Sequence, residues 1–135
     1  WEWKPGHVRS LLRTTSGLLA RSDSEDGGKT WSPLVPSGLP NNNSGVDAVR
    51  VEDGRVFLIY NPVEKNWGSR SPLNIAVSHD NGETWKDFAS LESEPEMEFS
   101  YPAIVTTENG IAVSYTWKRE RVRVWQIPMT ALEGI

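Results

Sequence analysis

An eight-residue string occurs twice, almost unchanged, in this chain of 135 residues. It reads SEDGGKTW from position 24 and SHDNGETW from position 78, so both copies fit the pattern S-x-D-x-G-x-T-W. Asp and Gly inside such a string are typical of a tight turn, because an Asp side chain binds turn amides and Gly accepts a positive φ. Two such turns, 54 positions apart, predict two copies of one structural unit.

The fixed positions of the repeat have predicted roles that are local. The Asp residues accept hydrogen bonds from turn amides, the Gly residues allow the backbone to reverse, and the Thr residues bond back across the turn. Each Trp is expected to tuck into its unit and anchor it. The structural residues are Ser24, Asp26, Gly28, Thr30 and Trp31 in the first copy, and Ser78, Asp80, Gly82, Thr84 and Trp85 in the second.

Short apolar segments rich in β-branched and aromatic residues fill the rest of the chain. Examples are GLLARSDS, RVFLIYNPV, PLNIAVSH, GIAVSYTW and RVRVWQI. Asp-Gly and Asn-Gly turn signals separate them, and helical periodicity is nearly absent. The sequence therefore predicts an all-β chain built from antiparallel hairpins.

The spacing of the repeat indicates β-propeller blades of four antiparallel strands. Strands near 45–51, 55–61, 72–78 and 87–91 complete one blade, and a further unit begins near Tyr101. The first unit lacks a clear inner strand, since WEWKPGH is a poor one. We therefore expect a single partial propeller domain over 1–135, about two and a half blades, with segments near 7–40, 41–95 and 96–128.

That number of blades is too small for a closed ring. Propellers close with about 4–8 blades, and closure removes exposed sheet edges. The chain is therefore expected to be part of a larger propeller, and its start on Trp-Glu-Trp without a Met indicates that the missing half is N-terminal. Self-association of a shortened relative, or an open fold, is the alternative.

Composition excludes several classes of function. With 14 basic and 18 acidic residues, the net charge of −4 argues against a nucleic-acid partner. No apolar run is long enough for a membrane span, so no membrane partner is expected. The absence of Cys excludes a thiol nucleophile, and no metal-ligand spacing occurs, so we expect no metal and no cofactor. The first residues show no signal-peptide pattern.

The two turns closely resemble the Asp-box, or BNR repeat, of sialidases and related propellers. The segments RTTSGLLARSDSEDGGKTWSP and YNPVEKNWGSRSPLNIAVSHDNGETW also resemble sialidase segments in which an Arg precedes an Asp-box. The resemblance implies a six-bladed propeller, of which this chain corresponds to the C-terminal portion. It also implies that the turns join third and fourth strands, away from the active site, and it favours a secreted or periplasmic location.

Arg13 and Arg70 fall on two positions of the sialidase arginine triad, which clamps the carboxylate of the substrate. A guanidinium is always charged and presents a planar fork that matches a carboxylate. A solvated surface charge is the alternative for each Arg. Asn43 and Asp47, in the string NNNSGVD, are expected near the mouth of the central channel, with a polar turn as the alternative.

The string EFSYPAIV resembles the strand that carries the nucleophilic Tyr of sialidases. In that register Phe99 occupies the Tyr position, and Phe has no hydroxyl. Tyr101 lies two residues on, hence on the same side of a regular strand, and is the one candidate nucleophile. A register slip or a different chemistry is equally open. Glu98 is a candidate site carboxylate.

Alternating charges occupy the two segments that flank this strand. Glu92, Glu94, Glu96 and Glu98 recur at every second position, and Pro95 favours an acidic loop. Arg119, Arg121 and Arg123 share one face of a strand. Solvation, or pairing with the acidic loop, is expected for these arginines.

These features predict part of a carbohydrate-active propeller, related to exo-sialidase glycoside hydrolases, that recognises an anionic glycan. A retaining glycosidase needs a nucleophile and a general acid together, and this chain offers neither clearly. The 135 residues alone are therefore expected to be catalytically silent. The alternatives are a non-catalytic Asp-box module that binds protein or glycan, and a self-associating relative.

Overall fold

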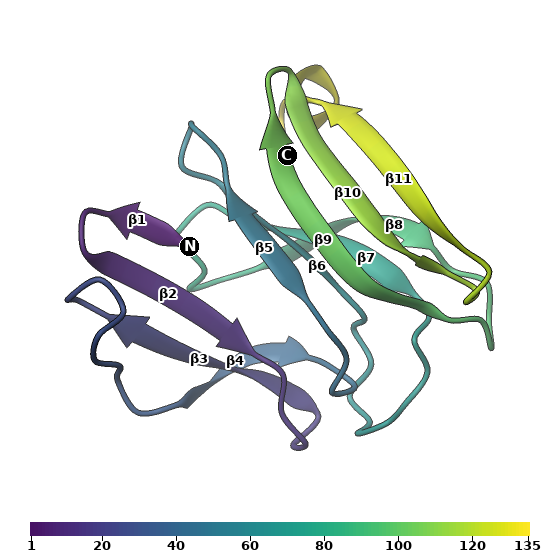
Figure 1. Ribbon diagram of the computed structural model, residues 1–135, viewed down its shortest axis with the longest axis horizontal. Coiled ribbons are helices and arrows are strands. Elements are labelled where there is room, and N and C mark those ends of the chain that lie inside the picture. Colours follow the sequence, from purple (N-terminus) through teal and green to yellow (C-terminus); the bar gives the residue numbers. More distant parts are fainter.

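The computed structural model describes all residues from 1 to 135 and contains three antiparallel sheets, which lie side by side in Figure 1. The first sheet has the order β1-β2-β3-β4, from β1 (Glu2–Lys4), β2 (His7–Leu12), β3 (Leu18–Ser24) and β4 (Val35–Pro40). The second has the order β5-β6-β7-β8, from β5 (Asp47–Arg50), β6 (Val56–Tyr60), β7 (Leu73–Ser78) and β8 (Lys86–Glu92). The third has the order β9-β10-β11, from β9 (Phe99–Thr107), β10 (Gly110–Trp117) and β11 (Arg121–Pro128).

The four strands predicted near 45–51, 55–61, 72–78 and 87–91 form the second sheet, in the expected order. A single 3₁₀ turn, η1 (Met129–Leu132), follows the last strand. No helix of the chain combines the length and the apolar character that crossing a bilayer would require.

The first sheet differs from its prediction at the N-terminus. The segment WEWKPGH does form an inner strand, β1, which pairs with β2 through Glu2 opposite Val8 and Lys4 opposite His7. An irregularity in register between those pairs leaves Trp3 without a partner. The sequence did not predict β1 because three residues of mixed polarity are too few to show the alternation of apolar and polar residues that marks a strand.

The second sheet lies between the other two, and β6 shows this most directly. All five of its residues are buried, as expected for a strand that is covered on both faces. Phe57 and Ile59 belong to the core shared with the third sheet, whereas Leu58 and Tyr60 belong to the core shared with the first. Successive side chains of β6 therefore pack alternately against the third sheet and the first sheet.

The two cores are unequal. The core between the second and third sheets contains 12 buried residues, including Phe99, Ile104 and Val113, and Leu132 of η1. The core between the first and second sheets contains five: Leu19, Leu39, Leu58, Tyr60 and Ala76. The second and third sheets are thus held together by more buried apolar area than the first and second.

The repeated turns join β3 to β4 and β7 to β8, the third and fourth strands of their sheets. In the second turn the Asp80 Oδ1 atom accepts bonds from the amides of Glu83 (3.1 Å) and Thr84 (2.8 Å), and Oδ2 accepts the Thr84 hydroxyl. Asp26 makes the same bonds in the first turn, with Lys29 and Thr30. The predicted turn chemistry is confirmed, including positive φ at the two central Gly residues, Gly28 and Gly82.

The two Trp residues of the turns do not behave alike. Trp85 packs against the core of the first and second sheets, as predicted. Trp31 remains 44% exposed, and its indole N–H bonds to the Gly28 carbonyl of its own turn at 3.0 Å. The expectation that Trp31 anchors its unit is wrong, because no neighbouring sheet covers that side of the first turn.

Candidate functional site

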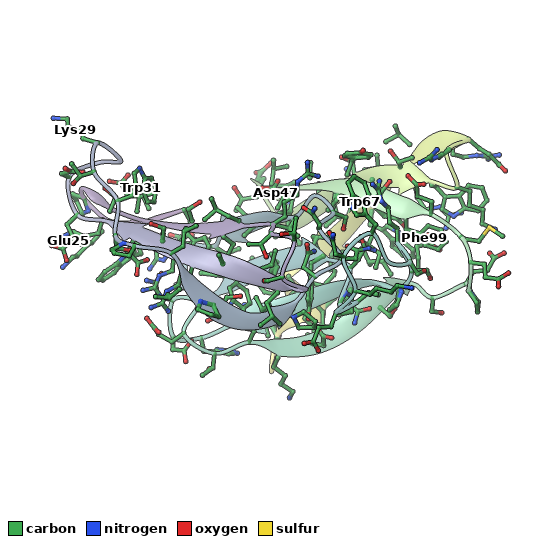
Figure 2. The ribbon with its side chains drawn as sticks, turned by 90° about the horizontal axis from the view of Figure 1, so that it is seen from below. Glu25, Lys29, Trp31, Asp47, Trp67 and Phe99 are labelled. Carbon is green, nitrogen blue, oxygen red and sulfur yellow. The ribbon has the colours of Figure 1, made fainter.

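Arg70 lies beside a hollow of about 450 Å³ at the loop ends of the second and third sheets. The loop between β6 and β7 and the segment that leads into β9 form its walls, together with the β10–β11 turn. The hollow is lined by Asn42, Trp67, Gly68, Ser69, Arg70, Glu96, Met97, Glu98 and Arg119. Trp67, which is labelled in Figure 2, lies on the first of these walls and is 75% exposed.

The Arg70 guanidinium is held between an acidic and an aromatic group. Its Nη1 atom lies 3.2 Å from Glu98 Oε1, and its carbon Cζ lies 5.1 Å from the centre of the Tyr101 ring. A guanidinium over an aromatic face gains a cation–π attraction in addition to the ion pair. Arg70 is therefore fixed in place while it lines the hollow.

Glu98 joins Arg70 to the β10–β11 turn. It accepts the Ser100 hydroxyl at 2.8 Å and Arg119 Nε at 2.6 Å. Burial acts to raise the pKa of Glu98, but the hydrogen bonds from Ser100 and Arg119 and the charges of Arg70 and Arg119 outweigh it, so its pKa lies below the ordinary value. Glu98 is thus an ionised carboxylate, and its protonated form is disfavoured.

Tyr101 points to the opposite side from the one predicted. The pairing of β9 with β10 shifts between Ser114 and Thr116, so that Tyr101 and Pro102 both stand opposite Tyr115. Tyr101 has a φ of 51°, as expected at a β-bulge. Phe99 is fully buried in the core, whereas Tyr101 is 61% exposed. The same-side prediction assumed a regular strand and is wrong, because one extra residue reverses the alternation.

The Tyr101 phenol lies in a positive environment. Arg70, whose guanidinium lies over the ring, is the largest influence on it and lowers its pKa; burial and the charge of Glu98 act in the opposite direction, and the charge of Arg13 lowers the pKa more weakly. Together the two arginines hold the pKa of Tyr101 below its usual range of about 10. Arg70 is therefore the dominant cation beside this phenol.

Backbone strain gathers around the same hollow. Seven residues other than Gly have positive φ. Five of them lie on the loops near Arg70, namely Asn43, Trp67, Glu96, Lys118 and Arg119, and a sixth, Tyr101, lies at the bulge of β9. Each such conformation costs about 1–3 kcal/mol, and costs of this kind concentrate at functional sites.

The remaining predicted residues divide between this hollow and other places. Arg13 directly follows β2, is exposed, and forms no ion pair. Asn43 has a φ of 62°, and its amide Nδ2 lies 3.2 Å from Asn66 Oδ1, next to Trp67. Arg70 lies in the loop before β7, within three residues of that strand.

Asp47 does not join the hollow. Its two carboxylate oxygens accept the backbone amides of Ala48 at 3.0 Å and of Ile104 at 2.9 Å, which ties β5 to β9. It lines a separate cavity of about 170 Å³ with Trp1 and Arg9. Figure 2 shows Asp47 near the middle of the molecule. Its observed contacts are structural.

The charged segments pair with each other as expected. Glu92 binds Arg123 at 2.6 Å, Glu94 binds Lys118, and Glu98 binds Arg119. Three cations, Lys118, Arg121 and Arg123, also surround the Trp117 ring at 4.5–5.1 Å. No group of three His, Cys, Asp or Glu side chains that could hold a metal ion occurs in the chain.

Sequence reasoning missed the buried polar residues behind the hollow. Asn42, Ser44 and Asn61 are all buried, and they bond to one another or to the loop that carries Arg70. The strings NNNS and YNP contained the signal, since Asn next to a predicted strand is common at turns that need side-chain hydrogen bonds. Asn61 is fully buried and so cannot be a surface turn residue.

Comparison with known proteins yields a family and a set of similar folds. The family model of the BNR repeat-like domain matches residues 1–113. An anhydrosialidase from Macrobdella decora is 26% identical over 145 residues, covering 93% of this chain and 19% of that protein.

Solved structures agree with this relationship. A leech intramolecular trans-sialidase superimposes with a TM-score of 0.74 at 20% identity, covering 98% of this chain and 23% of the other. The intramolecular trans-sialidase of Ruminococcus gnavus gives 0.73 at 20% identity, with coverage of 99% and 32%. The NanB sialidase of Streptococcus pneumoniae gives 0.68 at 20% identity, with coverage of 94% and 21%.

The chain thus spans about a fifth of the length of the curated relative that it matches. Its repeated turns, the order of its strands and these superpositions agree on one architecture. The three sheets are β-propeller blades of the sialidase type, and the chain belongs to the family of BNR repeat-like domains.

Proposed function

We propose that this chain contributes the carboxylate-binding part of a glycan site in a sialidase-related propeller. Arg70 and Arg13 bind the carboxylate of an anionic sugar, and Tyr101 lies beside it. The observation that carries the proposal is the position of Arg70, which is held by Glu98 and the Tyr101 ring at the edge of an open hollow. The names of the relatives, which are sialidases and an anhydrosialidase, support the same class of ligand.

The same geometry supports the proposal that these 135 residues do not cleave a glycoside by themselves. Phe99 is buried and has no hydroxyl, so the strand offers only Tyr101 as a nucleophile. A glycosidase also needs a carboxylic acid that can donate a proton. Glu98 is the carboxyl group beside Arg70, and its ion pairs keep it ionised.

Binding of N-acetylneuraminic acid, followed by tryptophan fluorescence, tests the first proposal. The matched control ligand is its methyl ester, which has the same ring without the negative charge. We expect the acid to bind at least about tenfold more tightly than the ester, because a charge-assisted pair contributes roughly 1.5–3 kcal/mol. Equal binding of acid and ester would contradict a carboxylate clamp.

Two substitutions assign the clamp to its residues. Arg70→Met should weaken binding of the acid by about tenfold or more, and Arg13→Met by less, since Arg13 is exposed and more screened. Arg121→Met removes an exposed cation from the β10–β11 hairpin and serves as the control. A fluorogenic sialoside tests the second proposal, and its hydrolysis by the purified chain would overturn it.

A further inference from the structure

Two buried Asn side chains face the loop that carries Arg70. The loop runs from Asn61, directly after β6, to the start of β7, and it forms one wall of the hollow without forming a strand. Its carbonyl groups therefore lack the partners that a sheet would supply, and buried carbonyls without partners are costly. The chain satisfies them with side-chain amides.

Asn61 is fully buried, and its amide nitrogen serves three carbonyl groups. Nδ2 lies 3.0 Å from the Arg70 carbonyl, 2.8 Å from that of Pro72 and 3.1 Å from that of Phe99. The Phe99 amide also donates to the Arg70 carbonyl at 3.0 Å. Asn61 therefore bonds both to the backbone of Arg70 and to the strand that presents Tyr101.

Asn42 extends this arrangement along the loop. Its Nδ2 atom donates to the Ser69 carbonyl at 2.6 Å and lies 3.4 Å from the Gly68 carbonyl. The backbone carbonyl of Asn42 accepts the Trp67 amide at 3.1 Å. The two Asn side chains thus bind four carbonyl groups between positions 68 and 72 of the loop. Each residue from 68 to 72 therefore has at least one hydrogen-bond partner within the protein.

Ser44 fixes which way both amides point. Its hydroxyl lies 2.5 Å from Asn42 Oδ1 and 2.9 Å from Asn61 Oδ1, so one proton is shared between two amide oxygens. With their oxygens turned toward Ser44, both amides direct their N–H groups to the loop. The orientation of the network is therefore set by one buried hydroxyl.

We infer that Asn42, Ser44 and Asn61 form a buried polar clamp that positions Arg70 relative to Tyr101. The three are positioning residues, because each acts through the backbone of the loop and of β9 and none lines the open side of the site with a charge. Their importance for glycan binding rests on the proposed function, whereas their effect on the geometry of Arg70 and Tyr101 does not.

The pH at which Tyr101 ionises depends on its position relative to Arg70, so it can be used to follow that position without any ligand. The chain has three Tyr residues, and burial raises the pKa of Tyr60 above its usual range and that of Tyr115 to about 12. Arg70 lowers the pKa of Tyr101, so Tyr101 ionises first as pH rises. Phenolate absorbance therefore follows this one residue at the start of an alkaline titration.

The test compares Asn61→Ala with Asn74→Ala, an Asn of the same sheet whose amide bonds only to Asp87. Arg70→Met gives the reference midpoint for ionisation of Tyr101 in the absence of the neighbouring guanidinium. We expect Asn61→Ala to raise the first phenol midpoint toward that of Arg70→Met, and Asn74→Ala to leave it at the parent value. Near-ultraviolet circular dichroism confirms that each variant is folded.

A purely structural role for Asn61 would lower the thermal midpoint and leave the phenol midpoint unchanged, and that result would overturn the clamp. An unchanged phenol midpoint in Arg70→Met would overturn it as well, since the two groups would then not be neighbours. Should Asn61→Ala fail to fold, Ser44→Ala decides in the same way, because it removes one hydroxyl and no amide.

A binding measurement separates this inference from the proposed function. If the parent binds N-acetylneuraminic acid, Asn61→Ala should weaken binding by about tenfold, which corresponds to about 1.4 kcal/mol of binding free energy. If the parent does not bind the acid, the proposed function fails, and the phenol titration still supports or overturns the clamp.

Discussion

The two Asp-boxes, Ser24–Trp31 and Ser78–Trp85, fold into the same turn in different surroundings. Within each turn the Ser, Asp and Thr side chains and the backbone amide of the central Gly make matching hydrogen bonds. The second turn lies against the first sheet, whereas the first projects from one end of the molecule, where Figure 2 labels Glu25, Lys29 and Trp31.

The variable positions account for the difference. Asn81 accepts the Trp1 indole N–H at 2.7 Å, and Glu83 accepts Arg9 at 2.7 Å and Arg21 at 2.6 Å. The equivalent positions of the first turn are Gly27 and Lys29, which make no such contacts with another sheet. The fixed residues of the motif therefore make the turn, and the variable ones decide whether it also joins two blades.

The Trp residues should show the largest difference. Trp85 packs on the core of the first two sheets and meets Trp1 edge-to-face at 6.2 Å, so Trp85→Ala should destabilise the chain by about 3 kcal/mol. Trp31→Ala should cost less than about 1 kcal/mol, because its ring is largely solvated. Urea unfolding measures both free energies. Equal losses would show that position within the repeat, and not the neighbouring sheet, sets the role of the Trp.

The ion cluster between the blades should give an intermediate effect. Arg9 is buried and contacts Asp23, Glu83 and the Asn81 carbonyl, so Arg9→Met should cost about 2 kcal/mol. Glu83→Gln should cost less, since the Glu83 side chain is half-exposed and screened. Lys29→Gln, the matched change in the first turn, should leave the unfolding midpoint unchanged. A double-mutant cycle of Arg9 and Glu83 that shows no coupling would contradict the cluster.

Acid titration should give the smallest difference between the turns. Bonds from Thr30 lead the effects that lower the pKa of Asp26 to about 2. At Asp80 burial opposes the shift, yet the bonds from Thr84 and Ser78 bring its pKa to about 2 as well. An unfolded Asp binds its proton nearer pH 4, so both carboxylates add stability above that pH, and this contribution is lost as pH falls toward 2.

Asp26→Asn and Asp80→Asn should therefore flatten the dependence of stability on pH by similar amounts between about pH 4 and 2. Unfolding by urea at several pH values measures this slope, and Asp87→Asn is the control outside the turns. A much steeper loss for one turn than for the other would mean that surroundings, and not only the local bonds, set the acid response.

The predictions that succeeded concern residues close together in the chain. Strand positions followed from alternating apolar segments, and the bonds of the Asp-boxes span only two to four positions. The surroundings of the candidate residues were less predictable. Arg70 contacts the Tyr101 ring, whereas the assumption of a regular strand put Tyr101 on the wrong side of β9, and the roles of Arg13 and Arg70 in binding stay predictions.

The sequence alone determined the order of most strands and the repeated turns, because periodicity and turn chemistry are local properties, and its resemblance to sialidases named the candidate arginines. The tertiary structure decided which Trp is buried, where Tyr101 points and what holds Arg70. Each of these depends on contacts between distant residues, such as Arg9 with Asn81 and Asn61 with Phe99. A β-bulge depends likewise on the pairing of two strands, and a single extra residue is enough to move Tyr101 from the core side of β9 to its exposed side.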